Sequence, residues 1–94
     1  HLYRRRRAQV VRALRDLPDV RVYPMDGGLH AVVEHDRPEA SVLDHLAQRG
    51  VMVSALSDYW AGGGRRRGLV FGFGGVPDAD LAAGLDAIRR ALSD

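Results

Sequence analysis

Apolar residues recur every three or four positions in three segments of the chain, which predicts three amphipathic helices. The expected ranges are residues 2–17, 38–50 and 77–92, and Pro18 ends the first of them. The apolar stripes consist of Tyr3, Val10, Val11, Leu14 and Leu17; of Val42, Leu43 and Leu46; and of Leu81, Leu85, Ile88 and Leu92. Each stripe needs a partner surface that keeps it from water.

Between the helices, four short runs of alternating or continuous apolar residues predict strands. They cover residues 20–23, 29–34, 51–53 and 68–73. A turn with two glycines separates the first two, as in an antiparallel hairpin. The order α, β, β, α, β, β, α predicts an α+β fold, a two-layer sandwich with the helices packed on one face of a four-stranded, mostly antiparallel sheet. We expect residues 1–94 to form one domain.

The composition narrows the chemistry that the chain can perform. Hydrophobic residues make up 46% and charged residues 28% of the 94 positions, an ordinary balance for a globular domain. All fourteen basic residues are arginine, so no lysine can form a Schiff base with a cofactor or serve a phosphate-binding loop. Cysteine is absent, which excludes disulfides, thiolate metal sites and cysteine nucleophiles.

The sequence gives no sign of a membrane segment. No apolar run approaches the roughly 18 residues that a membrane-spanning helix needs, and no signal peptide is present. We therefore expect a cytoplasmic protein without a membrane partner. The chain begins at His1, inside an arginine-rich helical pattern, and we expect it to be a piece of a longer protein.

Two arginine runs, Arg4–Arg7 and Arg65–Arg67, raise the question of nucleic-acid binding. The net charge is only +2. Four consecutive helical residues also spread over about 400° of arc, so the first run cannot form one basic face. We interpret both runs as solvated surface or as salt-bridge partners of another domain, with direct DNA contact as the alternative.

No pattern indicates a catalytic or metal centre. The histidines lack metal-ligand spacing, and no serine has the context of a nucleophile. Gly72, Gly74 and Gly75 lack the spacing of a nucleotide-binding loop and are typical of a bulge or a close backbone approach. Gly62–Gly64 indicates a loop tip, with a mobile flap as the functional alternative. His30, at the start of a strand, is placed either to face a cleft or to be half-buried.

The order of several short motifs carries more information than any one of them. A basic helix precedes Gly28-Leu29-His30, and a second helix ends in Arg49-Gly50-Val51-Met52-Val53. Tyr59 follows, then Gly68-Leu69-Val70-Phe71-Gly72-Phe73, a short link and the last helix. Nearly the whole chain thereby resembles the C-terminal small domain of fold-type I aminotransferases, and most closely the aminotransferase-like half of MocR-type regulators in the GntR superfamily.

Two departures from working aminotransferases favour the regulators. In many such enzymes the strand before the last helix carries an arginine that clamps the substrate carboxylate, in a pattern like Arg-Leu-Asn-Phe. Aligning Phe73 with that phenylalanine puts Val70 in place of the arginine, and Phe71-Gly72-Phe73 is similar to the regulators' Leu-Gly-Phe. Gly28-Leu29-His30 is likewise closer to the regulators. A genuine aminotransferase stays the alternative, with Arg67 as a replacement carboxylate contact.

The resemblance implies a segment that is not catalytic by itself. Pyridoxal phosphate would be bound through a lysine of a large domain of the same protein, and an N-terminal winged helix-turn-helix domain would read DNA in a homodimer. The small domain would close over the cofactor cleft when a small-molecule effector, an amino acid or amine, binds. His30, Tyr59 and Arg67 are then the candidates for lining the effector cleft. We expect no catalytic, cofactor-binding or metal-ligating residue within this chain.

Overall fold

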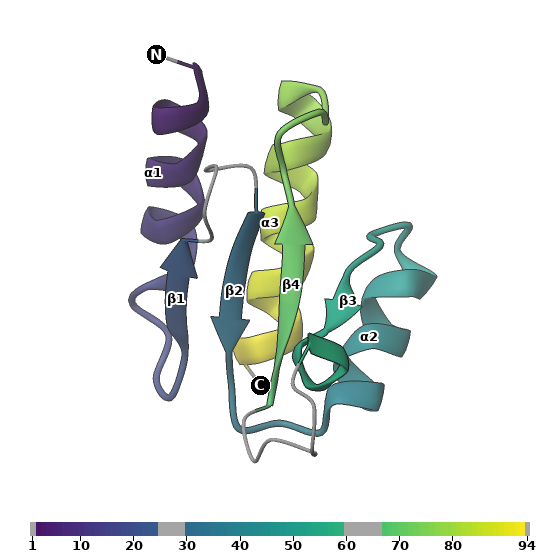
Figure 1. The fold of residues 1–94 in the computed structure, drawn as a ribbon. Coiled ribbons are helices and arrows are strands. Elements are labelled where there is room, and N and C mark those ends of the chain that lie inside the picture. Colours follow the sequence, from purple (N-terminus) through teal and green to yellow (C-terminus); the bar gives the residue numbers. More distant parts are fainter. Residues whose placement is uncertain (1, 25–29, 60–66, 94) are drawn as a thin grey trace.

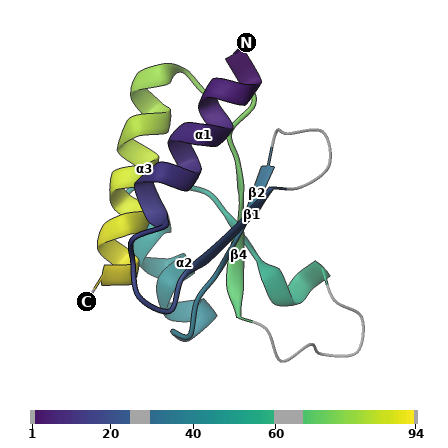
Figure 2. The same cartoon turned by 90° about the vertical axis from the view of Figure 1, so that its left-hand side faces the viewer.

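In the computed structural model of the chain, three helices cover one face of a four-stranded sheet (Figure 1). The structure describes residues 2–24, 30–59 and 67–93. The elements in chain order are α1 (Leu2–Leu14), β1 (Arg21–Pro24), β2 (His30–Glu34), α2 (Glu39–Gln48), β3 (Ser54–Ala55), the 3-10 helix η1 (Leu56–Tyr59), β4 (Gly68–Gly72) and α3 (Asp78–Ser93). Figure 2 shows α1, α2 and α3 on the same side of the sheet. The predicted α+β two-layer fold is confirmed.

The sheet has the strand order β1-β2-β4-β3, and each of these neighbouring pairs is antiparallel. β1 and β2 form the predicted hairpin. The chain then passes through α2, β3 and η1 before β4 enters between β2 and β3. β4 is therefore a central strand, paired on both sides, and it joins the first and last thirds of the chain.

The prediction of a strand at residues 51–53 is wrong. In that segment the backbone completes the C-terminus of α2: Gly50 N donates to Ala47 O at 3.0 Å and Val51 N donates to Leu46 O at 2.9 Å. Gly50 has a φ of 77°, the left-handed conformation that closes such a Schellman motif and that glycine adopts without strain. Because the Val51 amide is used in this way, the chain reaches the sheet only at Ser54.

The hydrophobic core fills the space between the sheet and the three helices. Alternate residues of the two central strands point toward the helices, as β geometry requires. The core residues are Val10, Leu14 and Leu17; Ala31 and Val33; Val42 and Leu46; Leu69, Phe71 and Phe73; and Leu81, Leu85, Ile88 and Leu92. These residues include most of the predicted helix stripes. Val11 is an exception, since it is only half-buried and lies on the outer side of α1.

A buried arginine ties the beginning of α1 to the beginning of α3. Arg6 is 7% exposed, and its guanidinium donates to Phe73 O at 2.9 Å, to Val76 O, and to Asp78 Oδ1 at 2.7 Å. The two carbonyls belong to the segment that leads from β4 into α3. Arg6 thus supplies donors to backbone acceptors that no strand partner reaches.

A second arginine ties the other ends of the same two helices. The Arg89 guanidinium donates to both carboxylate oxygens of Asp16, at 2.7 and 2.9 Å, and to Ala13 O at 2.8 Å. Since Arg6 joins the two beginnings and Arg89 the two ends, α1 and α3 run parallel, side by side (Figure 1).

Replacing Arg6 by methionine should destabilise the domain, because the carbonyls of Phe73 and Val76 lose their donor. A buried acceptor without a partner costs about 1–3 kcal/mol. Urea unfolding of the variant and the wild type measures the loss. Asp78→Asn is the control: it keeps both carbonyl contacts, and because the Asp78 side chain is 84% exposed to screening water, the loss of its charge should cost about 1 kcal/mol or less. Equal losses of unfolding free energy in both variants would show that Arg6 stabilises the domain through the ion pair and not through its hydrogen bonds to the two carbonyls.

Candidate functional site

The face of the sheet opposite the three helices is not covered by α1, α2 or α3 (Figure 2). Ala31 and Val33 point into the core, so the intervening β2 residues His30, Val32 and Glu34 point to the other side. The register places further side chains beside them: Arg21 and Tyr23 of β1, Val70 of β4 and Ser54 of β3. We call this surface the helix-free face. Among the described segments, η1 lies on this side of the sheet (Figure 2).

All three predicted effector-cleft residues are exposed. His30 begins β2 and pairs with Gly72, whereas Arg67 directly precedes Gly68, which pairs with Glu34 at the other end of the strands. At about 3.3 Å per residue, these two strand pairs lie roughly 13 Å apart. Tyr59 is 54% exposed at the end of η1. The structure therefore spreads the three candidates over the sheet side instead of joining them in one cluster, and their role stays a prediction.

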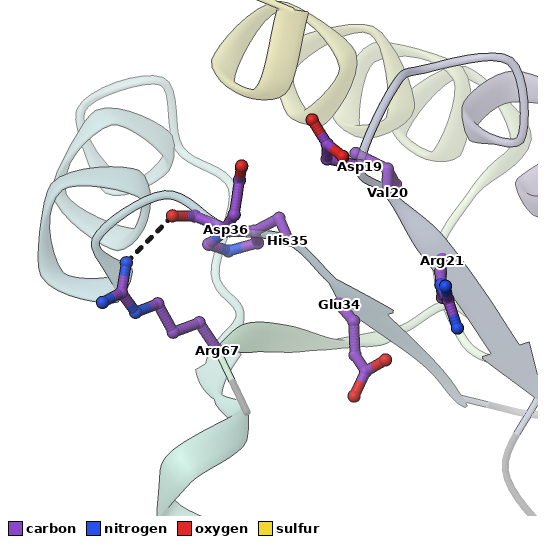
Figure 3. Close-up of a pocket in the computed structure, with 7 residues that line it drawn as sticks. All are labelled: Asp19, Val20, Arg21, Glu34, His35, Asp36 and Arg67. Carbon is purple, nitrogen blue, oxygen red and sulfur yellow. Dashed lines mark hydrogen bonds between the residues drawn. The ribbon is translucent and has the colours of Figure 1, made fainter. Parts of the chain in front are cut away.

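Arg67 does line a cleft of about 580 Å³. The lining residues are Asp19, Val20, Arg21, Glu34, His35, Asp36 and Arg67 (Figure 3). Arg67 donates to Asp36 O at 2.9 Å, and its own carbonyl accepts from His35 N at 3.0 Å. The cleft holds two guanidiniums and three carboxylates, so it offers contacts to ligand groups of either charge. The sequence analysis missed Arg21 and Glu34, although the hairpin register puts them side by side.

His35 forms the buried floor of this end of the sheet. It is 6% exposed, and its Nδ1 accepts a hydrogen bond from Arg37 N at 3.1 Å. Its Nε2 has no hydrogen-bond partner among the described residues. Burial lowers the pKa of His35 and outweighs the opposite effect of the nearby Glu39 carboxylate. The imidazole is therefore neutral near pH 7.

Glu39 connects the segment that ends in Tyr59 to the segment that begins at Arg67. Its carboxylate accepts from Ser57 Oγ at 2.6 Å, from Ser57 N at 3.1 Å and from Gly68 N at 3.1 Å. Burial alone would raise the pKa of Glu39, but these hydrogen bonds lower it further than burial raises it. One carboxylate at the start of α2 thus holds η1 and the first residue of β4 together. Periodicity gave no signal for this role.

Some of the sequence predictions fall on residues outside the part of the chain that the structure describes. Gly62–Gly64, Arg65 and Arg66 lie outside the described residues. Within the ranges 2–24, 30–59 and 67–93, no three histidine or acidic side chains come together as metal ligands. In the same ranges no helix is long and apolar enough to cross a membrane.

Comparison with known proteins supports the resemblance to the regulators. No protein-family model matches the chain. The chain is 47% identical over 92 residues, 98% of its length, to the HTH-type pyridoxine biosynthesis transcriptional regulator PdxR of Corynebacterium glutamicum. The resemblance to MocR-type regulators of the GntR superfamily is confirmed. The alignment spans 20% of that regulator, so the chain corresponds to about one fifth of its relative.

In this relative of MocR-type regulators, Val70 stands where the sequence comparison with aminotransferases put their carboxylate-binding arginine. Val70 lies on the helix-free face between Val32 and Ser54 in the register, and it is 4% exposed. Gly72 lies two residues further along β4, beside the His30 ring. A Cβ at position 72 would come within 3.2 Å of two atoms of that ring, so the lack of a side chain leaves room for the imidazole. Val32 and Val70 are therefore apolar neighbours in the middle of this face, with Tyr23 on one side of them and Ser54 on the other.

Gly68→Ala should destabilise the domain by about 1–3 kcal/mol, as overpacking of a well-packed site does. A Cβ at Gly68 would lie 2.5 Å from Val33 O, so the start of β4 would have to move away from β2 and from Glu39. Gly75→Ala is the matched control, because a Cβ there has nothing within 4 Å. Thermal or urea unfolding of the two variants makes the comparison, and equal stabilities would contradict the close approach.

The stability of the domain should fall as the pH drops below about 6.5, in part because of His35. Its pKa is lower in the folded state than its ordinary value of 6.5, so the unfolded chain takes up the proton first. This contribution is complete above the ordinary pKa and is lost as the pH falls toward the folded-state value. His35→Asn, which keeps an acceptor for Arg37 N, should show a shallower loss of unfolding free energy over this range. If the unfolding free energy falls equally steeply with pH in both proteins, His35 does not contribute to the pH dependence of stability.

Proposed function

We propose that the chain is the C-terminal part of the effector-sensing, pyridoxal-phosphate-binding, aminotransferase-like domain of a GntR/MocR-type transcriptional regulator. It contributes to sensing and has no catalytic role by itself. The observation that carries this proposal is the helix-free face, on which Val32 and Val70 lie between the polar side chains of His30 and Glu34 along the strands. Such a face suits packing against the large domain of the same protein over a bound ligand.

The residues present fit contact with pyridoxal phosphate or its effector, but not attachment of the cofactor. All fourteen basic residues are arginine, so the lysine that holds the group belongs to the rest of the regulator. When bound there, pyridoxal phosphate supplies an aldehyde that reacts with amines, which suits an amino acid or amine effector. We propose that the His30 imidazole, the Tyr59 hydroxyl and the Arg67 guanidinium line the effector cleft between this chain and the large domain.

Val70 supports a sensing role over transamination. A guanidinium at that position would bind a substrate carboxylate with two parallel hydrogen bonds, and valine has no polar atom to replace it. Arg67, the candidate replacement, donates to Asp36 O (Figure 3). It lies at the opposite end of the strands from His30. Effector binding then draws the small domain onto the large one in a homodimer, and the change of position is passed to the DNA-reading domain.

The test uses the whole regulator and a duplex from the region upstream of its own gene. Anisotropy titrations without and with pyridoxal phosphate and a panel of amino acids and amines should show an effector-dependent change in DNA affinity of about 5-fold or more. His30→Ala and Arg67→Gln should reduce that change and leave DNA affinity without effector as in the wild type. Tyr59→Phe removes only the hydroxyl and tests that group separately.

Arg49→Gln is the matched control, because Arg49 is exposed at the end of α2, away from the helix-free face. An undiminished effector response in the His30, Tyr59 and Arg67 variants would reject these residues as cleft residues. Steady conversion of an amino acid and a keto acid by the whole protein would establish the alternative, a genuine fold-type I aminotransferase.

A further inference from the structure

Helix α1 carries its arginines on two opposite sides. Arg6 points inward and is buried against the end of β4. On the outer side, a shallow groove of about 520 Å³ is lined by Arg4, Arg7, Ala8, Val11, Arg12 and Arg15. We call this set of four arginines around Ala8 and Val11 the arginine face.

The arginine face follows from the helix period. Positions 4, 7, 11 and 15 are three or four residues apart and so share one side of a helix, with 8 and 12 beside them. The consecutive run Arg4–Arg7 is spread around the helix, as the sequence predicts, and does not form the basic surface. The basic surface instead consists of Arg4 and Arg7 from that run, together with Arg12 and Arg15 from the following turns.

The positive charge of this face is not neutralised within the described part of the chain. Residues 2–14 of α1 include no acidic side chain. Asp16, the next acid along the chain, is held by both nitrogens of the Arg89 guanidinium. None of Arg4, Arg7, Arg12 and Arg15 forms an ion pair with another described residue. Four guanidiniums thus line about 16 Å of helix, and Arg12 also borders a groove that contains Asp16 and Asp86.

We propose that the arginine face binds backbone phosphates of duplex DNA next to the site that the regulator reads. The inference rests on the proposed function, since a DNA-reading domain in the same protein keeps duplex DNA at high local concentration. Arginine pairs with phosphate through two parallel hydrogen bonds, and small Ala8 and Val11 in the centre let a strand approach between the arginines. A span of about 16 Å covers several phosphates of one strand, which follow each other every 3.4 Å along the duplex axis.

Contacts of this kind carry no sequence information, so they add affinity and orient the regulator on DNA. By fixing where α1 lies on the duplex, they also fix the direction in which the whole domain points, because Arg6 and Arg89 tie α1 to α3.

The experiment measures how salt weakens binding of the whole regulator to a long fluorescent duplex of arbitrary mixed sequence. Arg4→Gln/Arg15→Gln removes two charges and keeps good helix formers. Each lost phosphate contact lowers the slope of log K against log salt by about 0.9, so this double variant should have a slope about 1.8 shallower. Arg49→Gln/Arg90→Gln is the charge-matched control from the α2–α3 side, where both arginines are exposed, and should keep the wild-type slope.

Three results would overturn the proposal. An unchanged slope in the Arg4/Arg15 variant means that the face does not touch DNA. Equal slope changes in both double variants mean that net charge alone is acting. If the slope is unchanged but the Arg4/Arg15 variant has a lower melting temperature or a changed oligomeric mass, the arginine face packs against an acidic protein surface instead of DNA. A missing effector response in the wild type would refute the proposed function and leave this slope comparison valid, so the two failures are distinguishable.

Discussion

The hydrogen bonds of the Arg6 guanidinium fix the geometry on which the rest of the domain depends. They join α1 to the segment that leaves β4, at the point where the sheet ends and α3 begins. With Arg89 and Asp16 closing the other end, α1 and α3 lie parallel as one layer, and α1 also contacts β1. This layer decides which side of α1 is buried, and therefore which arginines of the same helix remain outside.

The two exposed surfaces of interest lie on opposite layers of the sandwich, and that separation has a physical origin. Strand alternation sends every second residue of β2 and β4 away from the helices, which creates the helix-free face. Helical periodicity sends Arg4, Arg7, Arg12 and Arg15 away from the same core on the other side. In the proposed regulator, the domain contacts the large domain through the sheet and DNA through α1, since one contact does not cover the other.

The sequence predicted the helices, the hairpin and the fold class because periodicity reports directly which side of an element is buried. It failed at residues 51–53, since the apolar run Val51-Met52-Val53 after Gly50 gives no sign that the Val51 amide closes α2. It also did not reveal Glu39, whose partners Ser57 and Gly68 lie far along the chain, or the burial of His35, which follows from tertiary packing. Arg6 was within reach: it lies one turn before Val10 and two before Leu14, so it continues the apolar stripe of α1.

The backbone carbonyls at the end of the sheet lack hydrogen-bond donors from a neighbouring strand, which explains why an arginine stands in that stripe. Beyond Gly72 the backbone leaves the ladder, and an apolar residue at position 6 would bury the carbonyls of Phe73 and Val76 without donors. Guanidinium nitrogens fixed in one plane serve three acceptors at once, which the compact ammonium of a lysine does less well. The same contacts make α1, α3 and β4 move together. In the proposed regulator, a displacement of the helix-free face on effector binding therefore moves the arginine face as part of one rigid body, without any rearrangement inside the domain.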